Sequence, residues 1–98
     1  MPIVFCSLEI HLPFAQSLKD KRMVLRSAQE RLRSRFSFSI AEIQYQDQWQ
    51  RSVLGAVSIG SDRARLEQVS SEFLRESERI FGEQLIRSDI EFIELELD

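Results

Sequence analysis

Two kinds of hydrophobic spacing follow each other along this chain, and their order constrains the fold more than any other feature. Residues 3–12 alternate between apolar and polar side chains, which is typical of a strand with one buried face. The next segment carries apolar side chains at helical spacing, and Ser17 just before it is a favourable N-cap. The complete predicted order is strand, helix, strand, strand, helix and strand, over residues 3–12, 18–36, 38–45, 50–59, 62–82 and 86–97.

This order predicts an α+β fold in which one antiparallel sheet carries both helices on the same face. Right-handed crossovers through the two helices give the ferredoxin-like β-α-β-β-α-β two-layer sandwich, with strand order 4-1-3-2. The chain has 98 residues, so we predict a single domain spanning residues 1–98. The alternation changes phase within the last strand, which predicts a bulge near Phe92.

The other face of such a sheet starts without a cover, and we call it the open face. We expect three strands to supply its residues: Ile3, Phe5, Ser7, Glu9 and His11; Glu42 and Gln44; and Ser52, Leu54, Ala56 and Ser58. This set is mixed, with substantial apolar content. An exposed sheet face of this kind predicts a partner that covers it.

Charge is distributed unevenly along the chain. Residues 18–36 hold seven basic and two acidic residues, whereas the rest of the chain is acidic and the net charge is −3. The first helix is therefore predicted to be a basic element on an acidic body. Its candidate RNA- or anion-binding residues are Lys19, Lys21, Arg22, Arg26 and Arg33. The alternative is a solvated helix face that pairs with the acidic second helix or last strand.

Cysteine and hydropathy patterns indicate the compartment. Cys6 is the only cysteine, so no internal disulfide can form, and a lone thiol is compatible with the reducing cytoplasm. Its place in the first strand predicts that it packs in the core. No apolar stretch approaches the ~20 residues that a spanning helix needs, so no membrane association is expected.

No catalytic constellation is apparent, and we expect no enzyme activity. His11 is the only histidine, and Cys6 lies on the opposite face of the same strand. There is no glycine-rich phosphate loop and no Cys-x-x-Cys or His cluster, so neither a cofactor nor a metal site is expected. The third strand, residues 50–59, contains no aromatic residue on which RNA bases could stack.

Trp49 lies close to the predicted turn at residues 46–48 between the two central strands. It is predicted either to cap the open end of the core or to stand exposed as an anchor for a partner. The polar and charged residues around this end of the sheet complete a candidate interaction set: Trp49, Arg51, His11, Glu42 and Asp47.

Several strings of residues carry a family resemblance over essentially the whole chain. They are His11-Leu12-Pro13, Ser-Leu-Lys-Asp-Lys-Arg at 17–22, Arg35-Phe36, Ala41-Glu42 and Gln-Asp-Gln-Trp-Gln-Arg at 46–51. The chain resembles the small bacterial YlxP-like family, a domain family of unknown function. The resemblance implies a ferredoxin-like fold. The family's genes often lie beside those of transcription and translation factors, including a ribosome-binding factor, which implies a role in RNA or ribosome biology.

Two functional hypotheses follow. In the first, the protein is a non-catalytic accessory factor that binds RNA or a ribosomal subunit through the basic helix, with Trp49 and Arg51 as a second contact. In the second, it is a protein-interaction module that forms a homodimer through the open face. A basic helix that meets a neighbour's acidic strand would instead give salt-sensitive assembly.

Overall fold

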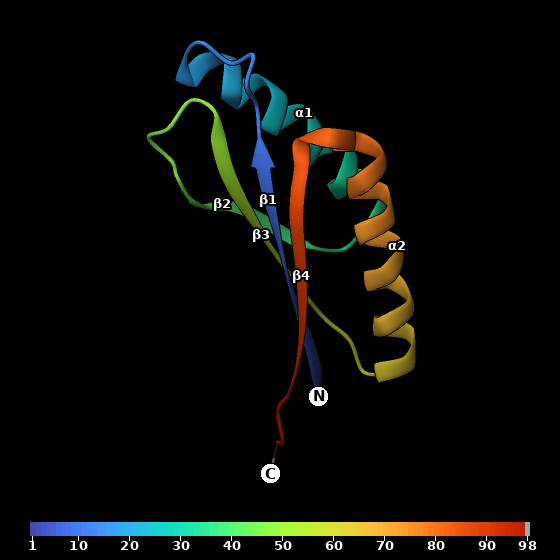
Figure 1. Cartoon of the computed structure of the whole chain (residues 1–98). Helices are drawn as coiled ribbons and strands as arrows, with labels where there is room; N and C mark the ends of the chain where they lie inside the picture. Colours follow the sequence, from blue (N-terminus) through green and yellow to red (C-terminus); the bar gives the residue numbers. More distant parts are fainter. Residues whose placement is uncertain (98) are drawn as a thin grey trace.

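The computed structural model describes residues 1–97, and the element order agrees with the sequence-based prediction (Figure 1). A short 3₁₀ turn, Gly82–Gln84, separates the last helix from the last strand. The elements are β1 (Pro2–His11), α1 (Leu18–Arg35), β2 (Ser39–Gln44), β3 (Arg51–Ile59), α2 (Arg63–Phe81) and β4 (Leu85–Glu94). The last strand thus ends three residues earlier than predicted.

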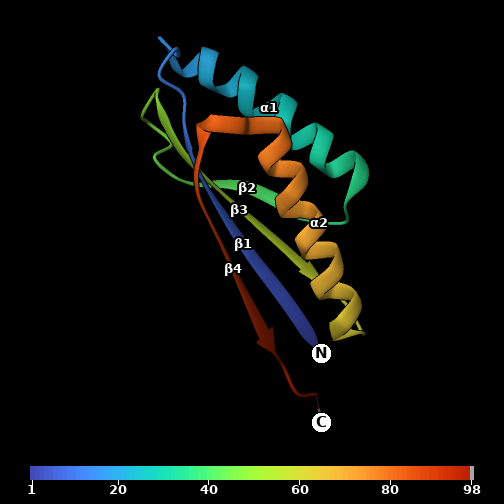
Figure 2. The ribbon, with the colours of Figure 1, turned by 45° about the vertical axis from the view of Figure 1, so that its right-hand side comes forward.

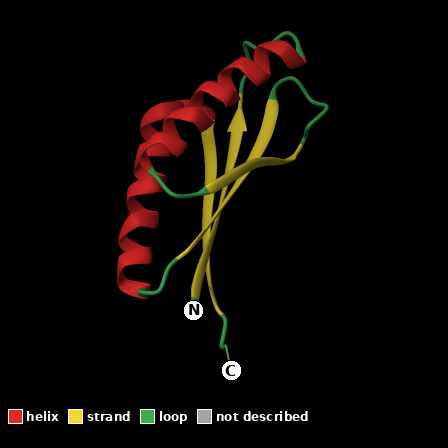
Figure 3. Cartoon of the chain, turned by 180° about the vertical axis from the view of Figure 1, so that it is seen from behind, coloured by secondary structure: helices red, strands yellow, loops and turns green. Residues whose placement is uncertain are grey.

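The four strands form one sheet in the order β2-β3-β1-β4, and every neighbouring pair is antiparallel. Read from the other edge this is the predicted order 4-1-3-2. Both helices cover the same face of the sheet (Figures 2 and 3). The predicted ferredoxin-like two-layer architecture is confirmed.

Local sequence signals explain where the helices begin and end. Ser17 caps α1, because its Oγ accepts a hydrogen bond from the backbone N of Asp20 at 3.0 Å. Asp62 caps α2 in the same way through the backbone N of Ala64, also at 3.0 Å. Gly82 ends α2 with a φ of +56°, a conformation that glycine adopts without steric cost.

The core lies between the helices and the inner face of the sheet. Alternate residues of β1, from Val4 to Ile10, are fully buried, as the alternation predicts. Three aromatic rings fill one end of this layer: Phe73 of α2 stacks on Phe38 at a centroid distance of 4.3 Å and meets Phe36 edge-on at 5.5 Å. Cys6 is buried here too, so its predicted core position is confirmed.

The predicted register of β3 is wrong. Leu54 and Ala56 pair with Leu8 and Cys6 of β1, and residues opposite each other on antiparallel strands share a face, so both lie in the core. Ser52 and Ser58 share their phase and also lie on the helix side. The open face instead receives the other set from this strand: Val53, Gly55, Val57 and Ile59. Both phases of residues 52–59 contain apolar side chains, so alternation alone could not choose between them.

Two smaller expectations also need correction. Of the two β2 residues expected on the open face, Glu42 pairs with Leu54 and therefore faces the helices, whereas Gln44, which follows an irregularity in β2, does reach the open face. The irregularity in β4 lies at Ile86, opposite Glu9 and Ile10, and not near Phe92. Phe92 pairs regularly with Val4, since β4 carries apolar side chains toward both faces and needs no bulge to bury it.

Candidate functional site

Lys21 lies inside the protein, which corrects the expectation that it binds RNA or another anion at the surface. Its side chain is fully buried, and its Nζ lies 2.9 Å from Oε2 of Glu42. The same ammonium donates hydrogen bonds to three backbone carbonyls, those of Tyr45 at 2.8 Å and of Gln46 and Arg51 at 3.3 Å. Lys21 is therefore an internal tie between α1 and the β2–β3 connection.

Glu42 completes this buried network. Its Oε2 also accepts a hydrogen bond of 2.7 Å from Oγ of the buried Ser52. An ion pair with this many partners satisfies the hydrogen-bonding groups that burial strips of water. Glu42 was predicted as an interaction residue, but its carboxylate is engaged by Lys21 and Ser52 of the same chain.

The β2–β3 connection, residues 45–50, is held in one shape by further contacts. Tyr45 adopts a positive φ of 64°, and its carbonyl accepts a hydrogen bond from the backbone N of Gln48 at 3.0 Å. The Arg51 guanidinium lies 4.0 Å from the centroid of the Tyr45 ring and bonds to its hydroxyl at 3.0 Å. Trp49 stands out from this fixed loop with 52% of its surface exposed, so it does not cap the core.

Three of the predicted anion-binding cations form an exposed stripe on α1, and we call Lys19, Arg22 and Arg26 the basic stripe. Within residues 1–97 these three make no ion pair and no side-chain hydrogen bond. Arg33 continues the same side of the helix, but its Nη2 donates to the Ile40 carbonyl at 2.6 Å and to Gln29 at 3.0 Å. Arg33 is thus already engaged with the neighbouring strand.

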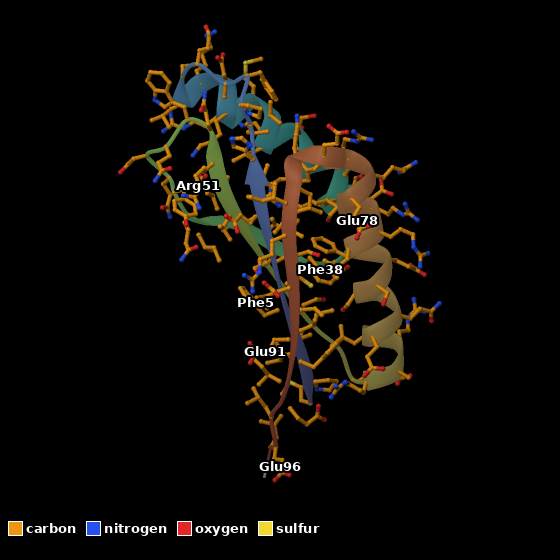
Figure 4. The ribbon with its side chains drawn as sticks, viewed as in Figure 1. Phe5, Phe38, Arg51, Glu78, Glu91 and Glu96 are labelled. Carbon is orange, nitrogen blue, oxygen red and sulfur yellow. The ribbon has the colours of Figure 1, made fainter. Side chains whose placement is uncertain are left out.

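The open face has an apolar half at the end where β1 begins. Ile59, Ile3 and Ile93 lie side by side across three strands. Val57, Phe5 and Glu91 form the next row, and Figure 4 shows Phe5 and Glu91 on the side away from the helices. Val57, Ile59, Ile93 and Ile43 are each at least 40% exposed. We call Ile3, Phe5, Ile43, Val57, Ile59 and Ile93 the apolar patch.

Gly55 lets the apolar patch lie flat. A Cβ at this position would be 3.0 Å from Cδ1 of Ile43 and 3.3 Å from Cε1 of Phe5. The absence of a side chain allows both residues to lean over the strand. The patch is therefore continuous from β2 to β4.

The other half of the open face is charged but internally paired. Arg51 binds Glu9 at 3.2 Å, and Arg87 binds Asp89 at 2.8 Å. A shallow depression of about 200 Å³ lies among these residues and is lined by Ser7, Glu9, Gln44, Val53, Arg87 and Asp89. Its ionic groups neutralise each other, so this half offers little net charge to a ligand.

The remaining predicted interaction residues do not form one cluster. His11 is exposed at the end of β1, opposite Arg51, and Asp47 is exposed in the loop that carries Trp49. Burial raises the pKa of the Cys6 thiol to about 11, which keeps it protonated and unreactive. Among residues 1–97 no group of three or more His, Cys, Asp or Glu side chains could hold a metal ion. No helix in this range could cross a membrane.

Sequence reasoning missed an ionic clamp between the helices. Glu76 of α2 is almost fully buried and accepts from Arg35 of α1 at 2.8 Å and from Arg79 of its own helix. The hydrogen bond from Arg79, followed by the nearby guanidinium charges, lowers the pKa of the Glu76 carboxyl below 4.5. The only signal in the sequence was an acidic residue that falls on the apolar side of α2.

Glu76→Gln should reduce stability at neutral pH but not in acid. When the pKa of a carboxyl is lower in the folded than in the unfolded state, its charge stabilises the fold at any pH above the unfolded-state pKa. This stabilisation is lost as the pH falls through the folded-state pKa. We expect the melting temperatures of the wild type and the variant to differ at pH 7 and to converge as the pH falls through the lowered pKa of Glu76. Thermal unfolding followed by circular dichroism between pH 3 and 7 measures this. A gap that persists unchanged in acid would contradict the role of the Glu76 charge.

Structural comparison shows the fold alone. A de novo designed protein, Foldit4, superposes with a TM-score of 0.55 at 10% identity, over 97% of this chain and 98% of that one. A dimeric ferredoxin-like protein of unknown function from Thermobifida fusca gives 0.54 at 15% identity, over 97% and 92%. The cofactor-independent oxygenase SnoaB from Streptomyces nogalater gives 0.51 at 13% identity, over 99% and 95%.

Sequence comparison shows the family. The profile described as "Protein of unknown function (DUF503)" matches residues 3–90. The "Uncharacterized protein YlxP" of Bacillus subtilis (strain 168) is 42% identical over 65 residues, which cover 66% of this chain and 71% of that protein. Both findings agree with the resemblance seen in the sequence. The chain belongs to the DUF503 family of YlxP-like proteins of unknown function.

Proposed function

We propose that this protein is a non-catalytic, cytoplasmic binding protein that works as a homodimer joined through the open face. The observation that carries the proposal is the apolar patch, six side chains that lie together on a sheet face without a helix over it. A contiguous apolar surface of this kind is unfavourable in water and typical of protein interfaces.

The size of the face supports a partner as large as a second copy. β1 is ten residues long, which corresponds to ~33 Å, and four strands span ~19 Å. The footprint is on the order of 600 Å², and protruding side chains increase the accessible area further. Two such faces together would bury about 1,200 Å², which is the lower end of the range for specific, stable interfaces.

The charges of the face favour a copy of this chain over a strongly charged partner. The two ion pairs, Arg51 with Glu9 and Arg87 with Asp89, are satisfied within one protomer. An apolar patch is complementary to itself about a two-fold axis, and Glu91, the charged residue in its second row, lies on the edge strand β4, where it can stay in contact with water. The related fold from Thermobifida fusca is described as dimeric, which is compatible with this assembly.

Light scattering after size-exclusion chromatography tests the proposal. At tens of micromolar we expect twice the chain mass of 11.5 kDa. The mass should not fall between low and high salt, because apolar contacts are not screened. A monomer at both salts would contradict the proposal. Dissociation at high salt would point instead to the basic stripe meeting acidic residues of a neighbour.

A second candidate function, RNA binding, is favoured by the basic stripe. Lys19 and Arg22 lie at the start of α1, where the positive end of the helix dipole makes each cation cost about 0.3–1 kcal/mol at low salt. Stability alone does not favour cations at this position. Cations near the start of a helix are well placed to bind phosphate, and the RNA backbone carries a phosphate at each nucleotide.

Replacing the cations of the basic stripe should weaken binding to RNA and to heparin, a polyanion that serves as the probe. We expect Lys19→Gln/Arg22→Gln/Arg26→Gln to elute from heparin at clearly lower salt than wild type, since three phosphate contacts are lost. The matched control is Arg31→Gln/Arg65→Gln/Arg75→Gln, which makes the same charge change at three other exposed arginines. Equal elution of the two variants would mean that net charge, and not the basic stripe, governs retention.

A further inference from the structure

Two aromatic side chains are exposed at one end of the molecule. Phe14 and Trp49 are 53% and 52% exposed, whereas the other aromatic residues of the chain are buried or half-buried. Phe14 lies in the β1–α1 connection and Trp49 in the β2–β3 connection. Figures 1 and 2 both show these two connections at the same end of the sheet.

Hydrogen bonds join the two connections. The Nε2 of Gln50, next to Trp49, donates to the carbonyls of Pro13 at 3.1 Å and Ala15 at 3.2 Å, on either side of Phe14. The backbone N of Leu12 donates to the Gln50 carbonyl at 2.9 Å. The segments that carry the two exposed rings are therefore held next to each other.

The buried Lys21 fixes this end further. Its three hydrogen bonds to backbone carbonyls lie at both ends of the loop that carries Trp49. A buried ion pair gives little net stability over apolar packing, but it can hold one conformation. Trp49 is thus presented by a loop that is ordered before any partner arrives, which lowers the entropic cost of binding.

The basic stripe begins beside these aromatic residues. Lys19 is the second residue of α1, five residues after Phe14, and Arg22 and Arg26 follow along the helix. From Lys19 to Arg26 the helix rises ~10 Å, which is the span of two to three nucleotides. The end of the molecule therefore combines exposed aromatic rings with a row of unpaired cations.

We propose that this end binds single-stranded RNA, with bases stacked on Trp49 and Phe14 and phosphates bound by the basic stripe. The inference rests on the RNA-binding candidate above and names the kind of RNA. Stacking platforms beside a cationic track are the usual means of binding single strands, because bases inside a duplex are not available to side-chain rings. Asp47 and Gln48, which directly precede Trp49, carry groups that can bond to a ribose 2′-hydroxyl, which DNA lacks.

Fluorescence anisotropy with three labelled probes tests this: a 12-nucleotide oligouridylate, an oligothymidylate of the same length, and a 12-base-pair RNA duplex. We expect the oligouridylate to bind most tightly. With three phosphate contacts, its logarithmic salt slope should be about −2. Equal affinity for the duplex would overturn the single-strand proposal, and tighter binding of the oligothymidylate would overturn the choice of RNA.

Trp49→Ala separates this inference from the proposal on which it rests. We expect about 5- to 150-fold weaker binding of oligouridylate, with an unchanged salt slope, because one stacking platform is lost and no cation is. Leu97→Ala, an exposed apolar residue outside this end, is the control and should bind like the wild type. Unchanged affinity of Trp49→Ala would overturn the stacking role while leaving the basic stripe in place. If no probe binds at low salt, RNA binding itself fails.

Discussion

Lys21→Met is expected to lower the free energy of unfolding by about 3–5 kcal/mol, although methionine fits a buried site of similar length. The substitution leaves Glu42 partly buried without its cation and removes the ammonium donor from three carbonyls, although that of Tyr45 keeps its bond from the backbone N of Gln48. An uncompensated buried charge is among the most destabilising changes in a small domain. Urea unfolding followed by circular dichroism measures the loss.

A neighbouring lysine supplies the control for this prediction. Lys19→Met removes the same kind of side chain from an exposed position and should not destabilise the protein; loss of a cation at the helix start can stabilise it by up to about 1 kcal/mol. Adding Glu42→Gln to Lys21→Met should recover part of the loss, because the unpaired charge is then gone. If Lys21→Met were as stable as wild type, Lys21 would not tie α1 to the β2–β3 connection.

Ile59→Asp is expected to raise the dissociation constant of the dimer by ~30-fold or more. Ile59 is 60% exposed in the monomer, so an aspartate there is solvated while the protomer is alone. In the dimer the same carboxylate would lie against the apolar patch of the partner, where no cation meets it. Sedimentation velocity over a concentration series measures the dissociation constant.

Met23→Asp is a closely matched control. Met23 is 63% exposed on α1, so the substitution makes the same chemical change on the helix side of the molecule. It should leave the dissociation constant unchanged, and circular dichroism should show both variants folded. Equal weakening by the two substitutions would indicate a general effect of charge. No weakening by Ile59→Asp would place the interface elsewhere.

Much of the fold could be predicted from the sequence because periodicity and caps agree with each other. The alternation of β1 buries the predicted residues from Val4 to Ile10, and Ser17 begins α1 as expected. Where one periodicity is ambiguous, prediction failed. In β3 both Leu54 and Val57 are apolar, so only pairing with β1 decides which of them enters the core.

The candidate site was harder to predict for a physical reason. The sequence places Lys21 within a run of exposed cations, and its helical position beside the apolar stripe was the only hint of burial. Its partners come from β2, the loop and β3, which lie 21 to 30 residues away along the chain. Such contacts exist only after the sheet has formed, and no local pattern encodes them.

An isotope-filtered NOE experiment tests the dimer most directly. Uniformly ¹³C-labelled protein is mixed with an equal amount of unlabelled protein, and only contacts between different copies are detected. We predict NOEs that join the methyl groups of Ile3, Val57, Ile59 and Ile93 to the Phe5 ring of the other copy. Intermolecular NOEs from residues of α1 or α2, or none at concentrations where the wild type sediments as a dimer, would contradict an interface at the open face.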